Sequence, residues 1–399
     1  MPTLWAGRAF DDIAMANIYL DSQYISRAAS RKNRLLEFVS SPNLIFCYSA
    51  IHIIESLPKA AVENQGAVER LSMIMRPRSR GGLVGWGPLA ELEASARQPK
   101  LDHLTRNVDE LLFPNISFSR SQWMKKVREG LKQTLRNNIP DVGIRRSVQS
   151  KLLKMGSLTP AASQFLRNEI GKTKERLSSK FPQFLPLLEE GGVYDFLEGK
   201  TSEQALIARF KESLINPVVL ASMVTDPDLV ALIDLSKILW AHMDDLAEIL
   251  PRLILSLVES QRNVGTEGYP IIRSMALDQF RSAEFRTAVA WRFSGIHVAA
   301  DELDQMLGIR LLVYVFSQYI LEKMGAYANP NRSSFGAVPK LKRSDMGDLL
   351  HVVYCPYVDL FGCDAAMRDR IRRAGWPITN VLVDDAEIEA RLARVVATR

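Results

Sequence analysis

The sequence predicts an α/β protein whose parallel sheet is assembled from the two ends of the chain around a large all-α inserted domain. Short apolar runs typical of buried strands occur only near the two ends, where helical patterns alternate with them. From about residue 91 to residue 325 the patterns are almost wholly helical. The predicted domains are residues 1–75 and 340–399, as the halves of one α/β domain, and residues 76–339 as the α-helical insertion.

The first seventy-five residues predict a strand–helix–strand–helix order. The strands are residues 17–21 and 44–48, and the helices are residues 26–39 and 50–57, with Ser49 as the cap of the second helix. Residues 76–88 are rich in Gly, Pro and Arg and predict a loop, either a domain junction or a basic flap.

The insertion and the C-terminal part complete the predicted order. The predicted insertion helices are residues 122–136, 161–178, 203–214, 228–248, 276–293 and 301–323. The C-terminal part predicts helices at 348–354, 365–374 and 386–396 and strands at 359–364 and 379–383. An insertion within one α/β domain explains why strand patterns resume after the long helical stretch.

The charge of the chain is unevenly distributed. Its formal net charge is +6, but residues 119–180 carry fifteen Lys and Arg against four Asp and Glu. Such a basic segment on an otherwise acidic molecule suggests a polyanionic partner, since binding nucleic acid releases counterions from its phosphates. The alternative is a solvated helical face. Candidate nucleic-acid contacts in this segment are Lys125, Lys126, Arg145 and Arg146.

Four acids mark a candidate metal site. Asp21 and Asp364 end predicted strands, Glu55 lies in the helix after the second strand, and Asp348 opens the helix that leads into a late strand. Ligands of open α/β sheets gather at the carboxyl ends of the strands. Clustered carboxylates repel one another unless a cation lies between them, and Mg²⁺ or Mn²⁺ prefers oxygen ligands. A single Asp at a strand end is, however, more often a cap or turn residue.

The sequences around these acids resemble the PIN-domain nucleases. Residues 17–22, Asn-Ile-Tyr-Leu-Asp-Ser, resemble the opening strand of that family, and residues 348–364 resemble its C-terminal half. The resemblance covers about residues 15–75 and 340–399. It implies a three-layer α/β/α domain in which Asp21, Glu55, Asp348 and Asp364 hold metal, with Ser22 adding a hydroxyl near the metal or an attacking water. Gln23 and Cys363 depart from the family's usual Asn and Thr or Ser, which puts support for a second metal in doubt.

Several neighbouring residues have other interpretations. Asp359 is interpreted as structural, and Asp345 as a less favoured substitute for Asp348. His351 and His52 are interpreted as hydrogen-bonded structural histidines. The arginines after Asp364, with Arg368 and Arg372 as the candidates, either hold phosphates or form a solvated face.

The resemblance implies a metal-dependent endonuclease, with RNA favoured over DNA as the substrate. Stand-alone members of the PIN-domain family include toxins of toxin–antitoxin systems, so a role in translation arrest or phage defence is expected. The alternatives are a structure-selective DNA nuclease and a catalytically degenerate PIN-fold scaffold. A protein inhibitor, a partner subunit or a homodimer is compatible with the sequence. No signal peptide or membrane segment is expected, and the cytoplasm is the expected location.

Overall fold

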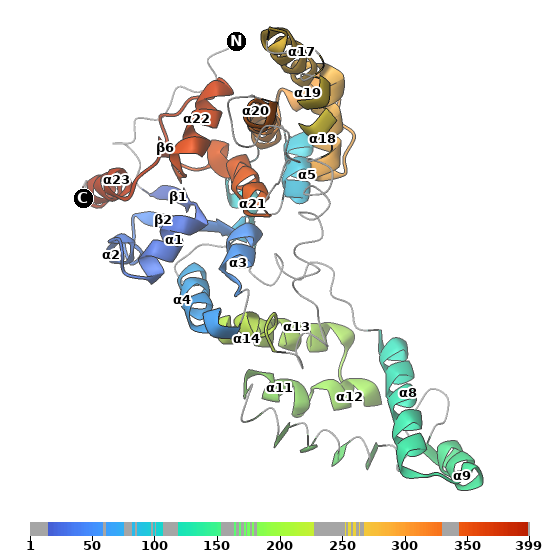
Figure 1. Ribbon diagram of the computed structural model, residues 1–399. Coiled ribbons are helices and arrows are strands. Elements are labelled where there is room, and N and C mark those ends of the chain that lie inside the picture. Colours follow the sequence, from blue (N-terminus) through green and yellow to red (C-terminus); the bar gives the residue numbers. More distant parts are fainter. Residues whose placement is uncertain are drawn as a thin grey trace. The chain divides into compact units, whose positions relative to one another are not determined.

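The computed structural model forms two compact units, the sheet unit (Met1–Leu111 with Met223–Arg399) and the helical unit (Leu112–Ser222) (Figure 1). It describes residues 15–58, 61–75, 86–96, 101–106, 119–152, 182–226, 267–328 and 343–397, with isolated residues and short stretches between these ranges. None of the helices within these ranges is long and apolar enough to cross a lipid bilayer.

Strands from both ends of the chain form the centre of the sheet, as the sequence predicts, whereas β3 and β4 come from the predicted insertion. The strand order is β4-β3-β2-β1-β5-β6. The strands are β1 (Ala16–Leu20), β2 (Leu44–Ser49), β3 (Gly82–Leu83), β4 (Thr105–Arg106), β5 (Leu360–Gly362) and β6 (Val381–Leu382). β1 pairs in parallel with β2 on one side and with β5 on the other, so segments more than 300 residues apart in sequence are neighbours at the centre (Figure 1). Only the pair β3–β4 is antiparallel among the described strands.

Apolar side chains on both faces of β1 explain its central place. Tyr19 belongs to a core cluster with α3 (Ala50–Ser56), α20 (Leu307–Ala328) and α21 (Arg343–His351). Ile18 and Leu20 belong to a second cluster with α1 (Ser22–Ala29), α2 (Leu35–Phe38) and α23 (Asp385–Ala397). Successive strand residues point to opposite faces, so helices cover both sides of the sheet. The α/β class is therefore confirmed.

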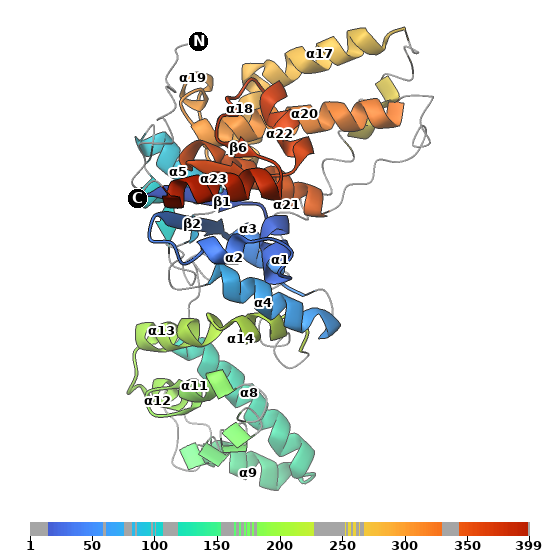
Figure 2. The same ribbon diagram turned by 90° about the vertical axis from the view of Figure 1, so that its left-hand side faces the viewer.

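The sheet unit includes helices that the sequence assigns to the insertion. α20 packs against α5 (Trp86–Ala96), α17 (Tyr269–Arg281), α18 (Ala283–Ser294), α22 (Ala365–Arg373) and η4 (Val352–Tyr357) (Figure 2). The helical unit, Leu112–Ser222, is accordingly smaller than the predicted insertion of residues 76–339. The reason is that α20 is apolar around much of its circumference, and its side chains complete the core above the sheet.

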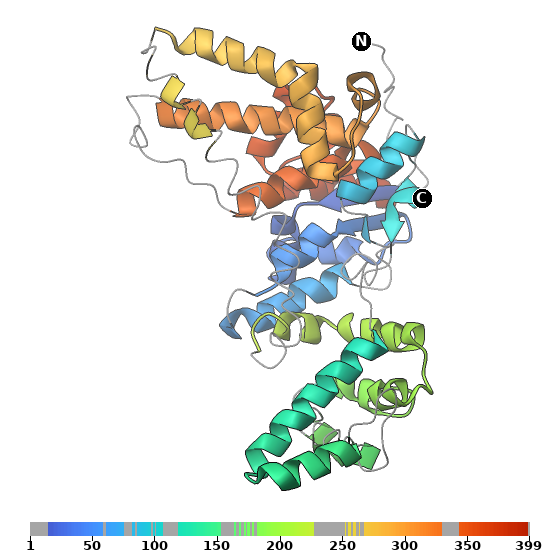
Figure 3. The same ribbon diagram turned by 90° about the vertical axis from the view of Figure 1, so that its right-hand side faces the viewer.

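The helical unit contains a long helix and several short ones. α8 (Arg120–Asn138) packs against α9 (Val142–Leu152) and α12 (Val193–Glu198), and Figure 3 shows α8 and α9 in dark green. The remaining described elements are η3 (Pro182–Phe184), α11 (Leu185–Leu188), α13 (Glu203–Leu214) and α14 (Pro217–Ser222). The bounds of α13 agree with the prediction.

Other elements differ from the prediction where a local signal stops a helix. Residues 26–39 form no single helix, because the chain turns at Arg31, whose φ is +54°. Ser282 caps α18 and separates it from α17 within the predicted helix 276–293. A break at Asp304 separates α19 (Ala300–Leu303) from α20, and β3 lies within the predicted loop 76–88. The predicted helix 228–248 and half of the residues of 161–178 lie outside the described residues.

Candidate acidic site

Asp21 and Asp364 lie at the same edge of the sheet, as expected for residues that follow adjacent parallel strands. The backbone N–H of Asp21 donates to the carbonyl oxygen of Gly362, at 2.9 Å, one residue beyond the paired part of β1 and β5. Each Asp is also the N-cap of the next helix. Asp21 accepts from the N–H of Gln23 at 3.1 Å, and Asp364 accepts from the N–H of Met367 at 2.6 Å. The general tendency of such residues to cap helices therefore applies to both.

Glu55 is held in place from several sides. Its Oε2 accepts from the Ser22 hydroxyl at 2.5 Å and lies 3.0 Å from Nε2 of His351. Its Oε1 lies against Gly347 of α21, where an added Cβ would stand only 2.0 Å away. Gly347 therefore allows Glu55 to approach α21 directly before Asp348. The predicted role of Ser22 near a metal stays a prediction; in the structure its hydroxyl binds Glu55.

The four predicted acids influence one another electrostatically. Burial, followed by the charges of Asp21 and Glu55, raises the pKa of Asp348 from 3.8 to about 7, and Asp364 adds a smaller effect. Burial also raises the pKa of Asp21, and Glu55 and Asp364 contribute in the same direction. Like charges raise carboxyl pKa values when no cation offsets their repulsion. The four carboxylates that the sequence singles out thus lie close enough to interact electrostatically.

Two buried histidines lie beneath these acids. His52 accepts from the N–H of Ser49 at Nδ1, 3.0 Å away, so its Nε2 carries the hydrogen that donates to the carbonyl oxygen of Leu20 at 2.6 Å. Burial, with a smaller contribution from His351, lowers the pKa of His52 well below its usual value. His351 behaves oppositely: burial alone would lower its pKa, but the carboxylates of Glu55, Asp21 and Asp348 raise it overall. Hydrogen-bonded roles for both histidines are confirmed.

The donor set fits a hard divalent cation, although its side chains do not form a coordination shell. Within the described part of the chain, no three Asp, Glu, His or Cys side chains are placed to hold a metal ion together. In this structure Asp21 and Asp364 instead cap helices, and Glu55 binds Ser22 and His351. Four mutually repelling oxygen donors at one sheet edge still match the preference of Mg²⁺ or Mn²⁺.

The arginines of α22 are engaged with carboxylates. Arg372 pairs with Asp369 at 2.5 Å, in the last turn of the helix. Arg368 lies in the first turn, next to Asp364, and its nearest ion-pair oxygen, on Glu387, is 3.7 Å away. Of the two predicted phosphate contacts, Arg368 is therefore the better placed beside the acids.

The predicted basic contacts of the insertion lie in the helical unit. Lys125 is exposed on α8, and Arg146 is exposed on α9. Arg145 is half-buried and donates to the carbonyl oxygen of Pro140 at 2.9 Å. Lys126 lies in α8, but its side chain is outside the described part of the structure.

Two further acids of the sequence have structural partners. Asp359 accepts from the backbone N–H of Asn17 at 2.8 Å and from its side-chain amide, at the opposite end of β1 from Asp21. Its structural interpretation is confirmed. Asp345 accepts from the Tyr319 hydroxyl at 2.9 Å and lies 3.4 Å from Lys323, so it binds α20 and does not substitute for Asp348.

Sequence reasoning missed Tyr19 and Gly347. The Tyr19 hydroxyl lies 2.7 Å from Nδ1 of His351 and 2.9 Å from the Ser49 hydroxyl. In the sequence Tyr19 reads only as an apolar strand residue, and a single glycine before Asp348 carries no signal of a close approach. Both roles depend on contacts between distant segments.

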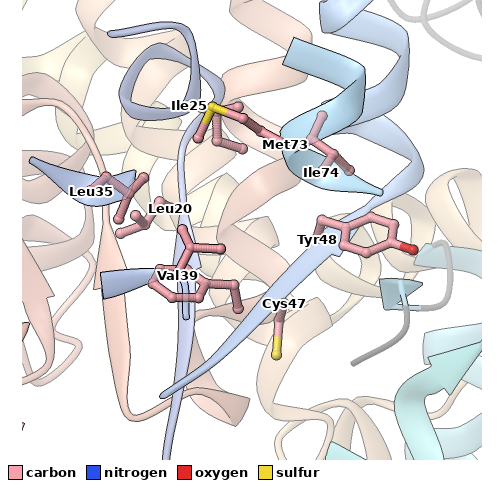
Figure 4. A pocket seen from close by; sticks show the side chains of 9 residues that line it. Leu20, Ile25, Leu35, Val39, Cys47, Tyr48, Met73 and Ile74 are labelled. Carbon is pink, nitrogen blue, oxygen red and sulfur yellow. The ribbon is translucent and has the colours of Figure 1, made fainter. Parts of the chain in front are cut away.

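A separate pocket lies among α1, α2, α4 (Asn64–Ile74) and the strands β1 and β2 (Figure 4). Its lining is apolar, including Ile25, Leu35, Val39 and Met73, and it encloses about 40 Å³. The one thiol in the lining, Cys47, is buried, and burial raises its pKa to about 12. The pocket therefore offers no charged group for chemistry.

Comparisons with models of protein families, with curated proteins and with solved structures find no match to this chain. Its function must therefore be inferred from the residues and their arrangement.

Proposed function

We propose that this chain is a divalent-metal-dependent nuclease that hydrolyses phosphodiester bonds, with RNA as the favoured substrate. The observation that carries the proposal is the gathering of Asp21, Glu55, Asp348 and Asp364 at one sheet edge, where burial and mutual repulsion raise the pKa of Asp348 to about 7. Folding such a cluster costs free energy, and a bound cation would offset this cost.

In this proposal the four carboxylates hold Mg²⁺ or Mn²⁺. The bound metal would activate water and stabilise the charge that develops on the phosphate. The protein itself would orient the substrate and neutralise its charge. Arg368 would contact a phosphate beside Asp364; its long ion pair with Glu387, at 3.7 Å and only partly buried, would be easily exchanged for such a contact.

The test is cleavage of end-labelled single-stranded RNA and DNA by the full chain with Mn²⁺, with Mg²⁺ and with excess EDTA. Asp364→Asn is the matched variant, since asparagine retains an oxygen that can cap α22. We expect the wild type to cut RNA only when metal is present, and the variant to show background cleavage while its circular dichroism is unchanged. Equal cleavage by both proteins would indicate a contaminating nuclease and overturn the proposal.

A second candidate is a non-catalytic scaffold with the same fold. It is favoured by the capping roles of Asp21 and Asp364, which give each acid a structural function without metal. A scaffold has no reason to bind Mn²⁺ through these residues. Isothermal titration with Mn²⁺ therefore separates the candidates: wild-type binding that is lost in Asp364→Asn supports the nuclease, and absence of binding supports the scaffold.

The helical unit offers a basic stripe for the proposed nucleic acid. Lys125, Arg128, Lys132 and Arg136 recur every three or four residues of α8 and so lie on one face of the helix. Lys125, Lys132 and Arg136 are exposed, whereas Arg128 is half-buried. Regularly spaced cations on one face suit contacts to successive backbone phosphates, which do not depend on base identity.

We expect the triple variant Lys125→Ala, Lys132→Ala and Arg136→Ala to bind single-stranded RNA about 10-fold more weakly. The slope of log K against log salt concentration should also become less steep by about 2, since each lost phosphate contact contributes about 0.7 to that slope. Fluorescence anisotropy at several salt concentrations measures both quantities. The control, Lys172→Ala, Lys200→Ala and Lys211→Ala, removes the same charge from the same unit. Equal weakening by both triples would show that net charge, and not the stripe, governs binding.

A further inference from the structure

A chain of hydrogen bonds runs from the core of the sheet unit to Glu55. It starts at the Ser49 hydroxyl, 2.9 Å from the Tyr19 hydroxyl, and passes through His351, whose Nδ1 lies 2.7 Å from the Tyr19 oxygen. It ends where Nε2 of His351 meets Oε2 of Glu55 at 3.0 Å. The members come from β1, the end of β2, α21 and α3, so the chain ties four elements together.

The direction of the final bond follows from the chemistry of its ends. A carboxylate only accepts, so Nε2 of His351 must carry the hydrogen that faces Glu55. In neutral His351, Nδ1 then accepts from the Tyr19 hydroxyl. In protonated His351, Nδ1 donates to the Tyr19 oxygen, and the Tyr19 hydroxyl turns to Ser49. Both forms keep the bond from Nε2 to Glu55.

The contacts of Glu55 fix the position of its second carboxylate oxygen, Oε1. Oε2 is occupied by the Ser22 hydroxyl and by His351, and Oε1 rests against Gly347, the residue before Asp348. A glutamate at the end of three rotatable bonds would otherwise adopt many rotamers. The contacts restrict it to one that points Oε1 toward the helix of Asp348.

The surroundings of Tyr19 and His351 argue against a purely space-filling role. Both are buried, and the Tyr19 ring is stacked on Phe361 at 5.7 Å and tilted against Tyr354 at 4.9 Å. Phenylalanine and leucine would fill such a core without the cost of burying polar groups. The polar atoms of Tyr19 and His351 instead bind each other, and His351 binds the partly buried carboxylate of Glu55.

We propose that Tyr19 and His351 are positioning residues that hold Glu55 in the orientation required for metal binding. This inference rests on the metal-dependent nuclease proposed above. Residues behind metal ligands fix the orientation of those ligands and strengthen their interaction with the ion, and their loss typically weakens metal affinity about 10- to 100-fold.

The experiment measures Mn²⁺ affinity of the full chain by isothermal titration, together with kcat and KM for RNA cleavage. The variants are Tyr19→Phe, which removes one hydroxyl and keeps the ring, His351→Leu, which removes the donor to Glu55, and His351→Gln, whose amide restores a donor. Tyr357→Phe is the control, because it also removes a hydroxyl that donates to a carboxylate, but that carboxylate is Glu93, which is not one of the four acids.

We expect Mn²⁺ affinity to fall about 10-fold or more in His351→Leu and about 3-fold or more in Tyr19→Phe, with partial recovery in His351→Gln. At saturating RNA and fixed Mn²⁺, kcat should fall while KM stays near its wild-type value. Tyr357→Phe should bind Mn²⁺ like the wild type. The recovery by glutamine distinguishes positioning from general loss of packing.

Two results would overturn the inference, and they differ from each other. If Glu55→Gln weakens Mn²⁺ binding while Tyr19→Phe and a folded His351→Leu bind as the wild type does, the nuclease proposal survives and the positioning role fails. If the wild type binds no Mn²⁺, the nuclease proposal fails and the positioning role fails with it. Tyr19→Phe keeps the test decisive even if His351→Leu does not fold.

Discussion

Asp348→Asn is expected to change activity and stability in opposite directions. Metal-dependent RNA cleavage should fall at least about 100-fold, because the variant replaces one of the four negatively charged carboxylates that would hold the metal with a neutral amide, which binds Mg²⁺ or Mn²⁺ more weakly. In EDTA at pH 8, the free energy of unfolding should rise by about 2 to 4 kcal/mol, because a neutral asparagine removes the cost of keeping an ionised carboxylate at this position. A shift of one pKa unit corresponds to about 1.4 kcal/mol. The rise follows from the pKa of Asp348, which burial and the neighbouring acids raise from 3.8 to about 7.

Thermal unfolding of the full chain in EDTA, followed by circular dichroism, measures the stability change. The two compact units need not unfold together, so hydrogen exchange of peptides from α21 should accompany the melting curve. Asp345→Asn is the matched control. It makes the same substitution in the same helix, but Asp345 binds Tyr319 and Lys323, so it should bring no gain in stability.

The opposing signs make this prediction informative. Adding Mn²⁺ should stabilise the wild type and leave Asp348→Asn nearly unchanged, because a ligand stabilises only the state that binds it. A variant that is less stable than the wild type in EDTA would show that Asp348 contributes favourable contacts. The carboxylates would then form a structural network and not a site destabilised by mutual repulsion in the absence of metal.

Glu93→Ala is expected to destabilise the sheet unit by about 3 kcal/mol. Glu93 of α5 is 1% exposed and accepts from the N–H groups of Gly308 and Ile309, at 2.6 and 3.2 Å, and from the Tyr357 hydroxyl. These N–H groups belong to the first turn of α20, where the helix itself offers no acceptor. Alanine would leave two buried N–H donors and the half-buried Tyr357 hydroxyl without their partner, whereas Glu93→Gln keeps an acceptor oxygen and should cost much less.

The same glutamate should make stability depend on pH. Burial raises the pKa of Glu93 from 4.5 to about 7, although its hydrogen bonds and Arg310 act in the opposite direction. Between these values the folded chain binds the proton more tightly than the unfolded chain does. The free energy of unfolding should therefore fall as the pH rises from about 4.5 to about 7, and remain low above that.

Hydrogen exchange of α20 peptides at pH 5 and pH 8 measures this dependence, after correction for the intrinsic effect of pH on exchange. The loss of protection between the two pH values should be smaller in Glu93→Gln, which does not titrate. An identical pH dependence in the variant would assign the effect to other groups, of which Asp348 is the first candidate because its pKa is also raised to about 7.

The sequence by itself determined the α/β class, the four strands β1, β2, β5 and β6, and the positions of two acids at strand ends. Apolar runs at residues 17–21 and 44–48 form β1 and β2, and Asp21 and Asp364 follow β1 and β5 as expected. These features are local: an apolar strand, an acid at its end and a cap at a helix start are each encoded by a few adjacent residues. The pairing of the two chain ends could be predicted because strand signals occur only there.

Tertiary structure alone decided which helices complete the sheet unit and how the acids are held. α20 lies far from the strands in sequence, and its apolar surface packs over the sheet. The bond between His351 and Glu55 joins residues 296 positions apart, and Gly347 matters only because Glu55 approaches it. Such contacts depend on the geometry of packed segments, and no pattern of neighbouring residues records them.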